Sequence, residues 1–204
     1  MSDWAWLEST RYYMALVLWL TLPPAIVYWL LLHPLAAFWR RLGVGATFAS
    51  LFVALGATGW VAWHFRGPFL ADSYPVRGVF VVIGLLLYVL AVVIEKKCRK
   101  HLKLRILVGV PELSAEQPGV LLTEGIYGHT RNPRYLDLII AITGLSLIVN
   151  YHGMYWLFVA TCIGIYAVVL LEERELRQRF GAAYDEYCRQ VPRFIPRSWK
   201  FLQS

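Results

Sequence analysis

The sequence predicts an all-α membrane protein: a polytopic helical bundle of about five transmembrane helices, followed by a cytoplasmic amphipathic C-terminal helix. The first observation is composition. Of the 204 residues, 58% are hydrophobic and only 16% are charged, whereas soluble domains average about 45–50% apolar and about 25% charged residues. The second is that the apolar residues form long stretches, each near the ~20 residues that a helix needs to cross a ~30 Å hydrocarbon core. A disordered chain and a typical cytosolic enzyme are poor fits.

Five apolar stretches are candidate spans. Three lie in residues 1–104, an N-terminal membrane region with a basic extension, and two lie in residues 105–204, the candidate catalytic region. An acidic N-terminus that reaches its first basic residue only at Arg11 does not fit a cleavable signal peptide. The stretches are approximately Tyr12–Leu32, Val44–Trp63, Gly78–Ile94, Tyr135–Val149 and Met154–Leu171.

The basic residues indicate which ends of the spans face the cytoplasm. Residues 33–43 hold two Lys or Arg, residues 95–134 hold eight and the tail after Leu171 holds seven, whereas the other side holds three. Because cytoplasmic loops are enriched in Lys and Arg, we expect the N-terminus outside and the C-terminus and active site in the cytoplasm. The basic run in residues 95–105 is then expected to attract anionic membrane lipids or, alternatively, to draw an anionic ligand toward the site. No nucleic-acid partner is expected, despite the net charge of +7.

Residues 125–135, Gly-Ile-Tyr-Gly-His-Thr-Arg-Asn-Pro-Arg-Tyr, predict the start of the fourth span. Asn132 is a favoured N-cap and Pro133 is favoured at the first helical position. The free N–H groups and positive dipole end of this helix, flanked by Arg131 and Arg134, suit an anion such as a carboxylate. Alternatively, the arginines reach lipid phosphates while Asn-Pro simply caps the helix. Asp137 is a charged residue one turn into the span.

Glu172 and Glu173 stand at the cytoplasmic end of the fifth span. Spans four and five are joined by the four residues Asn-Tyr-His-Gly, so they form an antiparallel hairpin. We therefore expect Arg131, Asn132 and Tyr135 to lie close to both glutamates. Two adjacent carboxylates at the edge of hydrocarbon are costly unless they are paired or functional. The alternative to a functional site is an arginine–glutamate cluster that closes the hairpin.

An amphipathic helix is predicted to continue from Glu172. Its apolar residues recur at spacings of four, four, three and four, which makes one stripe that we expect to pack as a lid over the loop. Gly181 weakens this helix and is expected to mark close packing or a bend. The stripe consists of Leu176, Phe180, Tyr184, Tyr187 and Val191.

Together these residues resemble the isoprenylcysteine carboxyl methyltransferase family and its prokaryotic relatives. The resemblance covers residues 105–197, in order. It rests on Gly-Ile-Tyr from Gly125, Arg-Asn-Pro-Arg-Tyr from Arg131, Glu-Glu from Glu172, and Val-Pro-Arg-Phe-Ile-Pro from Val191. It implies a helical membrane enzyme that uses S-adenosyl-L-methionine. No Gly-rich turn follows a predicted strand, so a Rossmann methyltransferase is excluded.

Carried over by position, the resemblance implies cofactor contacts in the loop, at the start of span four and after span five. Tyr127 and Tyr135 offer aromatic faces to an adenine or a sulfonium, and Glu172 can accept hydrogen bonds from ribose hydroxyls or the amino group. The implied contacts, to which we add His129, are Val120, Leu121, Leu122, Tyr127, Asn132, Pro133, Arg134, Tyr135 and Glu172.

Methyl transfer from a sulfonium depends on alignment more than on acid–base groups. The candidate catalytic residues are Arg131, which suits the methionyl carboxylate, Tyr135, whose ring suits an adenine or the sulfonium, and Glu173. A carboxylate acceptor needs no base, whereas a thiol or amine does, and Glu173 and His129 are the nearest candidates for that base. No metal site is predicted, because the three cysteines lack ligand spacing. Eukaryotic members carry a substrate-binding arginine four residues before the glutamate that corresponds to Glu172, where this chain has Val168. We therefore expect an apolar wall and a hydrophobic or lipid-like thiol, amine or acid as acceptor, rather than prenylcysteine.

Two alternatives stay open. Membrane sterol reductases resemble this family in the C-terminal half and use NADPH, but they are longer and need additional basic residues for a 2′-phosphate. The other alternative is a non-catalytic bundle that binds anionic lipid through its basic loop. Affinity for S-adenosylmethionine, for NADPH or for neither separates the three hypotheses.

Overall fold

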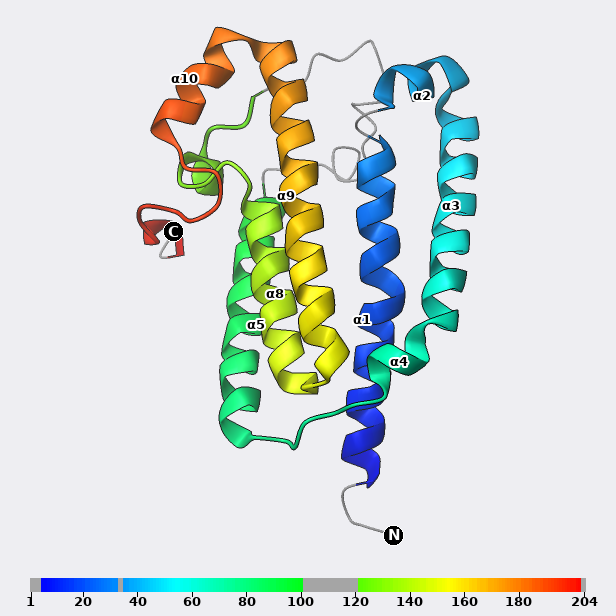
Figure 1. Ribbon diagram of the computed structural model, residues 1–204. Coiled ribbons are helices and arrows are strands. Elements are labelled where there is room, and N and C mark those ends of the chain that lie inside the picture. The colour runs from blue at the N-terminus through cyan, green and yellow to red at the C-terminus, as the bar shows by residue number, and fades with distance from the viewer. Residues whose placement is uncertain (1–4, 33–34, 101–120, 203–204) are drawn as a thin grey trace.

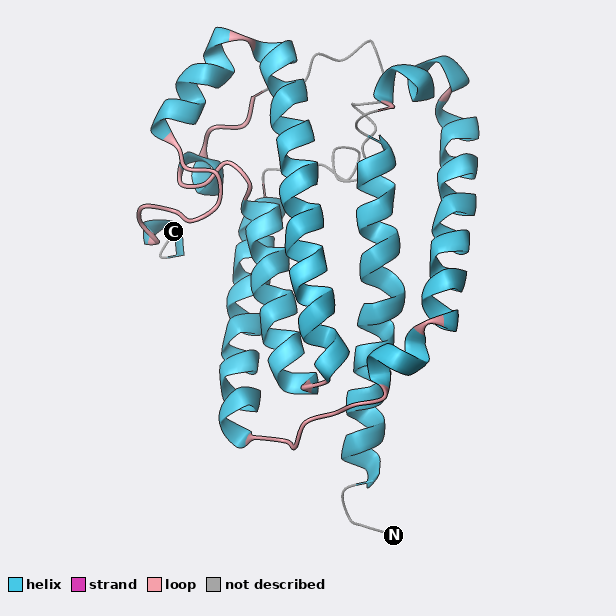
Figure 2. Cartoon of the chain, viewed as in Figure 1, coloured by secondary structure: helices cyan, strands magenta, loops and turns pink. Residues whose placement is uncertain are grey.

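The computed structural model describes residues 5–32, 35–100 and 121–202, and in these ranges the chain is helical apart from loops and one isolated β-bridge, Ser73 with Tyr151. The long helices run side by side (Figures 1 and 2). The predicted all-α membrane bundle is confirmed. In chain order the elements are α1 (Ala5–Leu32), α2 (Ala36–Leu42), α3 (Val44–His64), α4 (Arg66–Leu70), α5 (Gly78–Arg99), η1 (Gly125–Gly128), α8 (Pro133–Val149), α9 (His152–Phe180), α10 (Ala182–Gln190) and η2 (Lys200–Leu202).

Four of these helices, α1, α3, α5 and α9, are long and apolar enough to cross a membrane. They contain four of the five predicted spans. The other predicted span is α8, whose 17 residues measure about 26 Å at 1.5 Å per residue, slightly less than a ~30 Å hydrocarbon core. Figure 1 shows α8 lying alongside α5 and α9. It is therefore a shorter helix packed among the long ones.

Two glycines let α5 and α8 approach each other closely. A Cβ placed on Gly84 would lie 2.5 Å from the carbonyl oxygen of Gly144, and a Cβ placed on Gly144 would lie 2.5 Å from the carbonyl oxygen of Gly84. Backbone atoms cannot move aside as a flexible side chain can, so any larger residue would force the helices apart. Small residues are typical of such contacts in membrane bundles. This contact holds α8 against α5.

Arg11 fastens the opposite end of the bundle from α10. Its side chain is only 3% exposed, which its place near the N-terminus did not indicate. The guanidinium donates to the carbonyl oxygens of Val149 at 2.9 Å and of Tyr74 at 2.7 Å, and it pairs with Glu8 at 2.7 Å. These acceptors compensate for the cost of burying the charge. Arg11 thereby ties α1 to the loop before α5 and to the end of α8.

α9 contains the fifth predicted span and the first part of the predicted amphipathic helix. It ends at Gly181, whose φ of 55° turns the chain, and α10 then runs back from that end (Figure 1). The expected bend at Gly181 is thus confirmed, although it divides the apolar stripe between two helices. The stripe still packs together: Tyr184, Tyr187 and Val191 are buried, with Leu176 and Phe180 against them.

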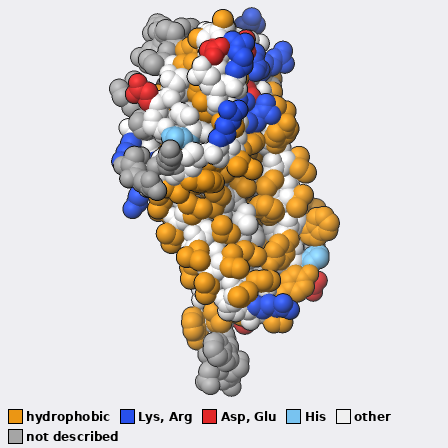
Figure 3. Space-filling view, turned by 90° about the vertical axis from the view of Figure 1, so that its left-hand side faces the viewer, with side chains coloured by type: hydrophobic (Ala, Val, Ile, Leu, Met, Phe, Trp, Pro, Cys, Tyr) orange, Lys and Arg blue, Asp and Glu red, His pale blue; other side chains and the backbone are white. Residues whose placement is uncertain are grey.

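Charged and apolar side chains occupy different parts of the surface. Figure 3 shows a broad hydrophobic area over the middle of one face, with Lys and Arg gathered near the top, where α9 and α10 meet. The apolar helices place the protein in the membrane as an integral, multi-pass protein.

Candidate functional site

The start of α8 and the end of the apolar part of α9 lie side by side, as the hairpin predicts. The two helices are joined by Asn150 and Tyr151 alone, and the left-handed conformation of Asn150 (φ 53°) ends α8. Asn is among the residues that adopt this conformation at a helix C-terminus. The predicted convergence is realised by hydrogen bonds from Arg131 and Asn132 to Glu173 and from Tyr135 to Glu172.

Glu173 is the centre of a buried ionic cluster, formed with Arg131, Asn132 and Arg193. Its side chain is 2% exposed. Arg131 donates to Oε1 at 3.0 and 3.2 Å, and Arg193 donates to Oε2 at 2.9 Å and to Oε1 at 3.1 Å. The amide of Asn132 adds a bond to Oε1 at 3.2 Å. Two cations and an amide compensate for the loss of hydration of this carboxylate.

The same cluster fastens the tail to the start of α8. Nη1 of Arg131 donates to the carbonyl oxygen of Val191 at 2.6 Å, and its backbone N–H donates to that of Pro192 at 2.9 Å. The backbone and side-chain N–H groups of Asn132 both donate to the carbonyl oxygen of Arg193, at 3.2 Å. Arg193 was not among the candidate catalytic or cofactor residues. Its sequence signal is the Val-Pro-Arg-Phe-Ile-Pro segment, which ends the amphipathic helix and returns an arginine toward the membrane surface and the mouth of the site.

The start of α8 departs from the predicted capping arrangement. Pro133 occupies the first helical position, as predicted, and Asn132 occupies the N-cap position. The side chain of Asn132, however, makes no capping bond to α8, because it is turned to the carboxylate of Glu173, an ionised and therefore stronger acceptor. On another side of the helix start, the guanidinium of Arg134 lies 5.9 Å from the ring centre of Trp29.

Glu172 has a different environment from its neighbour. Its side chain is partly exposed, and it accepts a hydrogen bond from the hydroxyl of Tyr135 at 2.5 Å. The ring of Tyr135 is buried in a cluster with Ile165, Val168 and Val169. Val168 is 2% exposed. From the sequence we expected Val168 to form an apolar wall of an open site. In the structure it instead fills a packed core.

The loop before α8 packs beneath α10, as the predicted lid requires. The hydroxyl of Tyr187 donates to the carbonyl oxygen of Tyr127 at 2.6 Å, and Leu121 packs against the buried side chains of α10. Burial raises the pKa of the phenols of Tyr127 and Tyr187, so both are protonated at neutral pH.

The other predicted cofactor residues of the loop lie toward α5 and the tail. Leu122 packs against the cluster that contains Tyr127 and Cys98 of α5. The ring of His129 lies 5.5 Å from that of Phe201. Val120 lies outside the described residues.

A cavity of about 330 Å³ lies between α5 and α8 close to the same end of the bundle. From α8 it is lined by Arg134, Asp137, Leu138 and Ala141, whose spacing places them on one helix face. α5 contributes apolar residues and also Glu95 and Arg99. The cavity was not expected from the sequence, in which its one signal is Asp137, a charged residue in an apolar helix.

Comparison with known proteins assigns the family. A model described as phospholipid methyltransferase matches residues 79–183, which is half of the chain and includes both glutamates and the hairpin. The chain belongs to the phospholipid methyltransferase family. Membership of this family supports a membrane methyltransferase. The narrower resemblance to isoprenylcysteine carboxyl methyltransferases stays a prediction.

The chain is also similar to part of a reductase. The Delta(14)-sterol reductase of Mus musculus is 37% identical over 89 residues, which cover 37% of this chain and 19% of the reductase. The matched region thus spans about a fifth of the length of that relative. No solved structure matches the chain significantly.

Proposed function

We propose that this protein is an S-adenosylmethionine-dependent membrane methyltransferase that acts on a hydrophobic or lipid-like acceptor. The observation that carries the proposal is the match to phospholipid methyltransferases over residues 79–183. This range holds the hairpin in which Tyr135 bonds to Glu172 and Arg131 pairs with Glu173. The proposal places the site on the cytoplasmic face, because most Lys and Arg of the sequence lie toward that end.

The residues around this hairpin fit the chemistry of S-adenosylmethionine, which carries both cationic and anionic groups, hydroxyls and an aromatic base. Glu172 is a carboxylate acceptor for the ammonium or the hydroxyls, and Arg134 is a cation for the carboxylate. Bound there, the cofactor would supply an electrophilic methyl group on a positively charged sulfur. We propose that the predicted set holds it: Leu121, Leu122, Tyr127, His129, Asn132, Pro133, Arg134, Tyr135 and Glu172, together with Val120.

Arg131 and Glu173 are better described as positioning residues than as groups that contact the acceptor. Both make their hydrogen bonds to each other, to Asn132 or to the tail. A base must be within reach of the proton it removes, and Glu173 is 2% exposed. We propose that the pair fixes α8, and with it Tyr135, relative to α9.

The acceptor has a fitting site in the 330 Å³ cavity between α5 and α8. Its apolar lining, which includes Tyr88, Val92 and Leu138, suits an alkyl or isoprenoid body. Arg134 and Asp137 lie at the start of α8, so a reactive group at that end would stay close to the interface. A hydrophobic thiol, amine or acid fits this arrangement.

The test is cofactor binding by the full chain in lipid nanodiscs, measured by calorimetry with S-adenosylmethionine and with NADPH. We expect S-adenosylmethionine to bind and NADPH not to bind. Methyl-labelled cofactor then identifies the acceptor in a panel of hydrophobic thiols, amines, acids and farnesylcysteine. Binding of neither cofactor would leave the non-catalytic lipid-binding bundle as the better description.

A reductase is the second candidate, because of the similarity to the sterol reductase. Binding of NADPH without S-adenosylmethionine would establish it over methyl transfer. The similarity covers only 19% of that protein, whereas the methyltransferase match covers half of this chain. Methyl transfer is therefore the better-supported function.

A further inference from the structure

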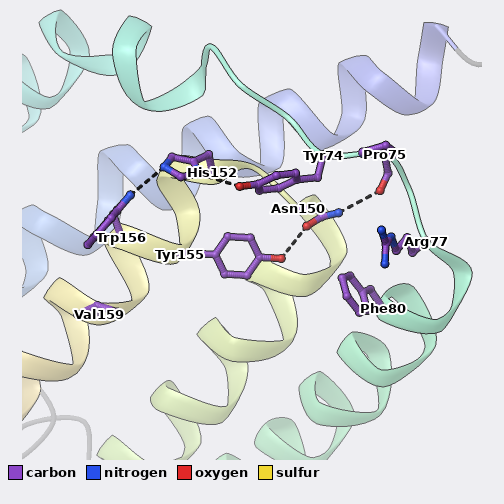
Figure 4. Close-up of a pocket in the computed structure, with 9 residues that line it drawn as sticks. All are labelled: Tyr74, Pro75, Arg77, Phe80, Asn150, His152, Tyr155, Trp156 and Val159. Carbon is purple, nitrogen blue, oxygen red and sulfur yellow. Dashed lines mark hydrogen bonds between the residues drawn. The ribbon is translucent and has the colours of Figure 1, made fainter.

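A second cavity, of about 560 Å³, lies at the opposite end of the bundle from the candidate site. It is formed where the loop before α5 meets the turn between α8 and α9, and Figure 4 shows the side chains that line it. About twenty residues of α9 separate it from Glu172, which is about 30 Å at 1.5 Å per residue. A ligand in this cavity is therefore too distant to be the methyl acceptor.

The hydrogen bonds of His152 determine which of its ring nitrogens carries the proton. The indole N–H of Trp156 lies 3.0 Å from Nε2, and an indole can only donate. Nε2 must therefore accept, so the proton of the neutral ring is on Nδ1. Nδ1 lies 2.9 Å from the hydroxyl oxygen of Tyr74 and donates to it. The hydroxyl proton of Tyr74 is consequently left for another acceptor.

Other polar groups of the cavity are satisfied within the protein. Tyr155 donates to the amide oxygen of Asn150 at 2.6 Å, and the amide nitrogen of Asn150 donates to the carbonyl oxygen of Pro75 at 3.0 Å (Figure 4). These bonds hold the walls of the cavity in place. The donors available to a ligand are those that make no hydrogen bond within the protein.

Arg77 is such a donor and the one charged residue among those that line the cavity. In the described part of the chain its guanidinium has no carboxylate or carbonyl acceptor, and it lies over the ring of Phe80, whose centre is 5.7 Å from Cζ. Figure 4 shows the guanidinium turned toward the side on which Asn150 lies. Arg77 also precedes the N-terminus of α5, which has no side-chain cap and so adds the positive end of a helix dipole.

The positive charge of Arg77 favours an anionic ligand, and the position of the cavity in the membrane indicates which kind of anion can reach it. α5 and α9 both begin here, so the cavity lies at the boundary between hydrocarbon and water, where aromatic residues such as Trp156 are enriched. Its lining also includes the apolar side chains of Phe80 and Val159, which suit an acyl chain. A phosphate attached to acyl chains matches both the cationic and the apolar residues that line the cavity.

We propose that this cavity binds a membrane phospholipid, whose phosphate receives hydrogen bonds from Arg77 and from the hydroxyl of Tyr74 while an acyl chain packs against Phe80 and Val159. Arginine suits a phosphate because its planar donors can make two parallel bonds. The lipid would brace the loop before α5 against the start of α9. This site is independent of the proposed methyl transfer.

The test is lipid-dependent thermal unfolding of the full chain in detergent micelles. Palmitoyl-oleoyl phosphatidylglycerol is titrated against palmitoyl-oleoyl glycerol, which has the same chains without phosphate, and against inorganic phosphate. We expect phosphatidylglycerol alone to raise Tm, because a ligand that binds the folded state stabilises it. An equal effect of the neutral lipid, or full reproduction by inorganic phosphate, would overturn the proposal.

Two arginine variants make the test specific to the cavity. One charge-assisted hydrogen bond corresponds to an affinity loss of roughly 10- to 150-fold. Arg77→Gln should therefore need a phosphatidylglycerol concentration higher by about that factor to give the same rise in Tm. The matched control is Arg66→Gln, since Arg66 is at the same end of the bundle but stacks on Trp63, 3.7 Å from its ring centre. The Tm of Arg77→Gln without lipid should equal that of the unmodified protein. An equal loss in both variants would show general charge attraction and contradict the proposed site.

Discussion

Glu172 and Glu173 are adjacent in the sequence, yet their surroundings give them different roles. Glu173 is buried and accepts hydrogen bonds from two arginines and an amide. Glu172 is partly exposed and bonded to the hydroxyl of Tyr135. Since successive helix residues point about 100° apart, two neighbours on α9 can face the tail cluster and the tyrosine separately. Removing the charge of Glu172 should therefore have a different consequence from removing the charge of Glu173.

Substitution Glu172→Gln is expected to weaken S-adenosylmethionine binding while leaving the protein folded. It removes the charge of the acceptor that we assign to the cofactor, and a charge-assisted hydrogen bond contributes roughly 1.5–3 kcal/mol, or a ~10- to 150-fold affinity loss. Calorimetry measures the affinity, and an unchanged Tm confirms the fold. The matched control is Glu186→Gln, an exposed glutamate on α10. Unchanged cofactor affinity in Glu172→Gln would assign this residue to packing.

The substitution Glu173→Gln is expected mainly to lower the stability of the folded protein. It leaves the guanidinium groups of Arg131 and Arg193 without their shared counter-charge, and breaking a buried pair in this way costs about 3–5 kcal/mol. Tm should fall clearly, and trypsin should cut the tail after α10 faster. Glu186→Gln, which disrupts only an exposed pair with Arg189, should change neither. A Glu173→Gln protein with normal stability but no methyl transfer would instead support the catalytic role predicted from the sequence.

At the scale of elements, the break between α9 and α10 decides how the tail reaches the site. Gly181 has φ 55° and ψ −129°, a conformation that residues with a Cβ rarely adopt. The bend directs Tyr184 and Tyr187 onto the loop before α8 and brings Arg177 to Asp185, at 2.8 Å. Without the bend, α9 would continue away from the loop and leave the apolar stripe exposed.

Gly181→Ala is expected to destabilise the docked tail by about 1–3 kcal/mol, the usual cost of a disfavoured backbone conformation. No atom lies within 4 Å of a Cβ built at this position, so the effect would come from the backbone alone. Gly59→Ala in α3 is the control, since its Cβ also meets open space but the helical backbone there favours alanine. Thermal unfolding and limited trypsin digestion of residues 182–202 measure the difference. Equal behaviour of the two variants would contradict the proposed role of the bend.

The sequence predicts the elements and their pairing better than it predicts the contacts between distant segments. The hairpin that brings Tyr135 to Glu172 follows from a short connection and two apolar stretches. Arg193 reaches Glu173 only because Gly181 turns the chain. A glycine within a helical sequence pattern does not reveal its backbone dihedral angles, so the direction of the turn could not be predicted. The burial of Val168 depends likewise on how α8 and α9 pack. Comparing this one position with the arginine of other family members gives no information about that packing. The cavity between α5 and α8 depends on how side chains of two helices distant in the sequence pack against each other.

At the scale of the whole molecule, the two ends of the bundle have different chemistry. One end carries the cluster around Glu173 and the basic surface near α10 (Figure 3). The other carries Arg11, buried among carbonyl oxygens, and the aromatic cavity with Arg77. A long apolar helix, α9, connects the two ends, so in a membrane they must face opposite sides. The charge bias of the sequence predicts that the basic end faces the cytoplasm.

This orientation can be measured by cysteine labelling from one side of the membrane. In a chain whose Cys98, Cys162 and Cys188 are replaced by serine, Asp72→Cys and Arg189→Cys place single thiols at opposite ends, both at exposed positions. In intact cells an impermeant maleimide should label Asp72→Cys only, and Arg189→Cys should react only after the membrane is opened. The reverse pattern would put the proposed methyltransferase site outside, where S-adenosylmethionine is not supplied, and would thereby contradict the proposed function. Labelling of both thiols from one side would show that α9 does not cross the bilayer, and the separation of the cofactor site from the phospholipid site across the membrane would then fail as well.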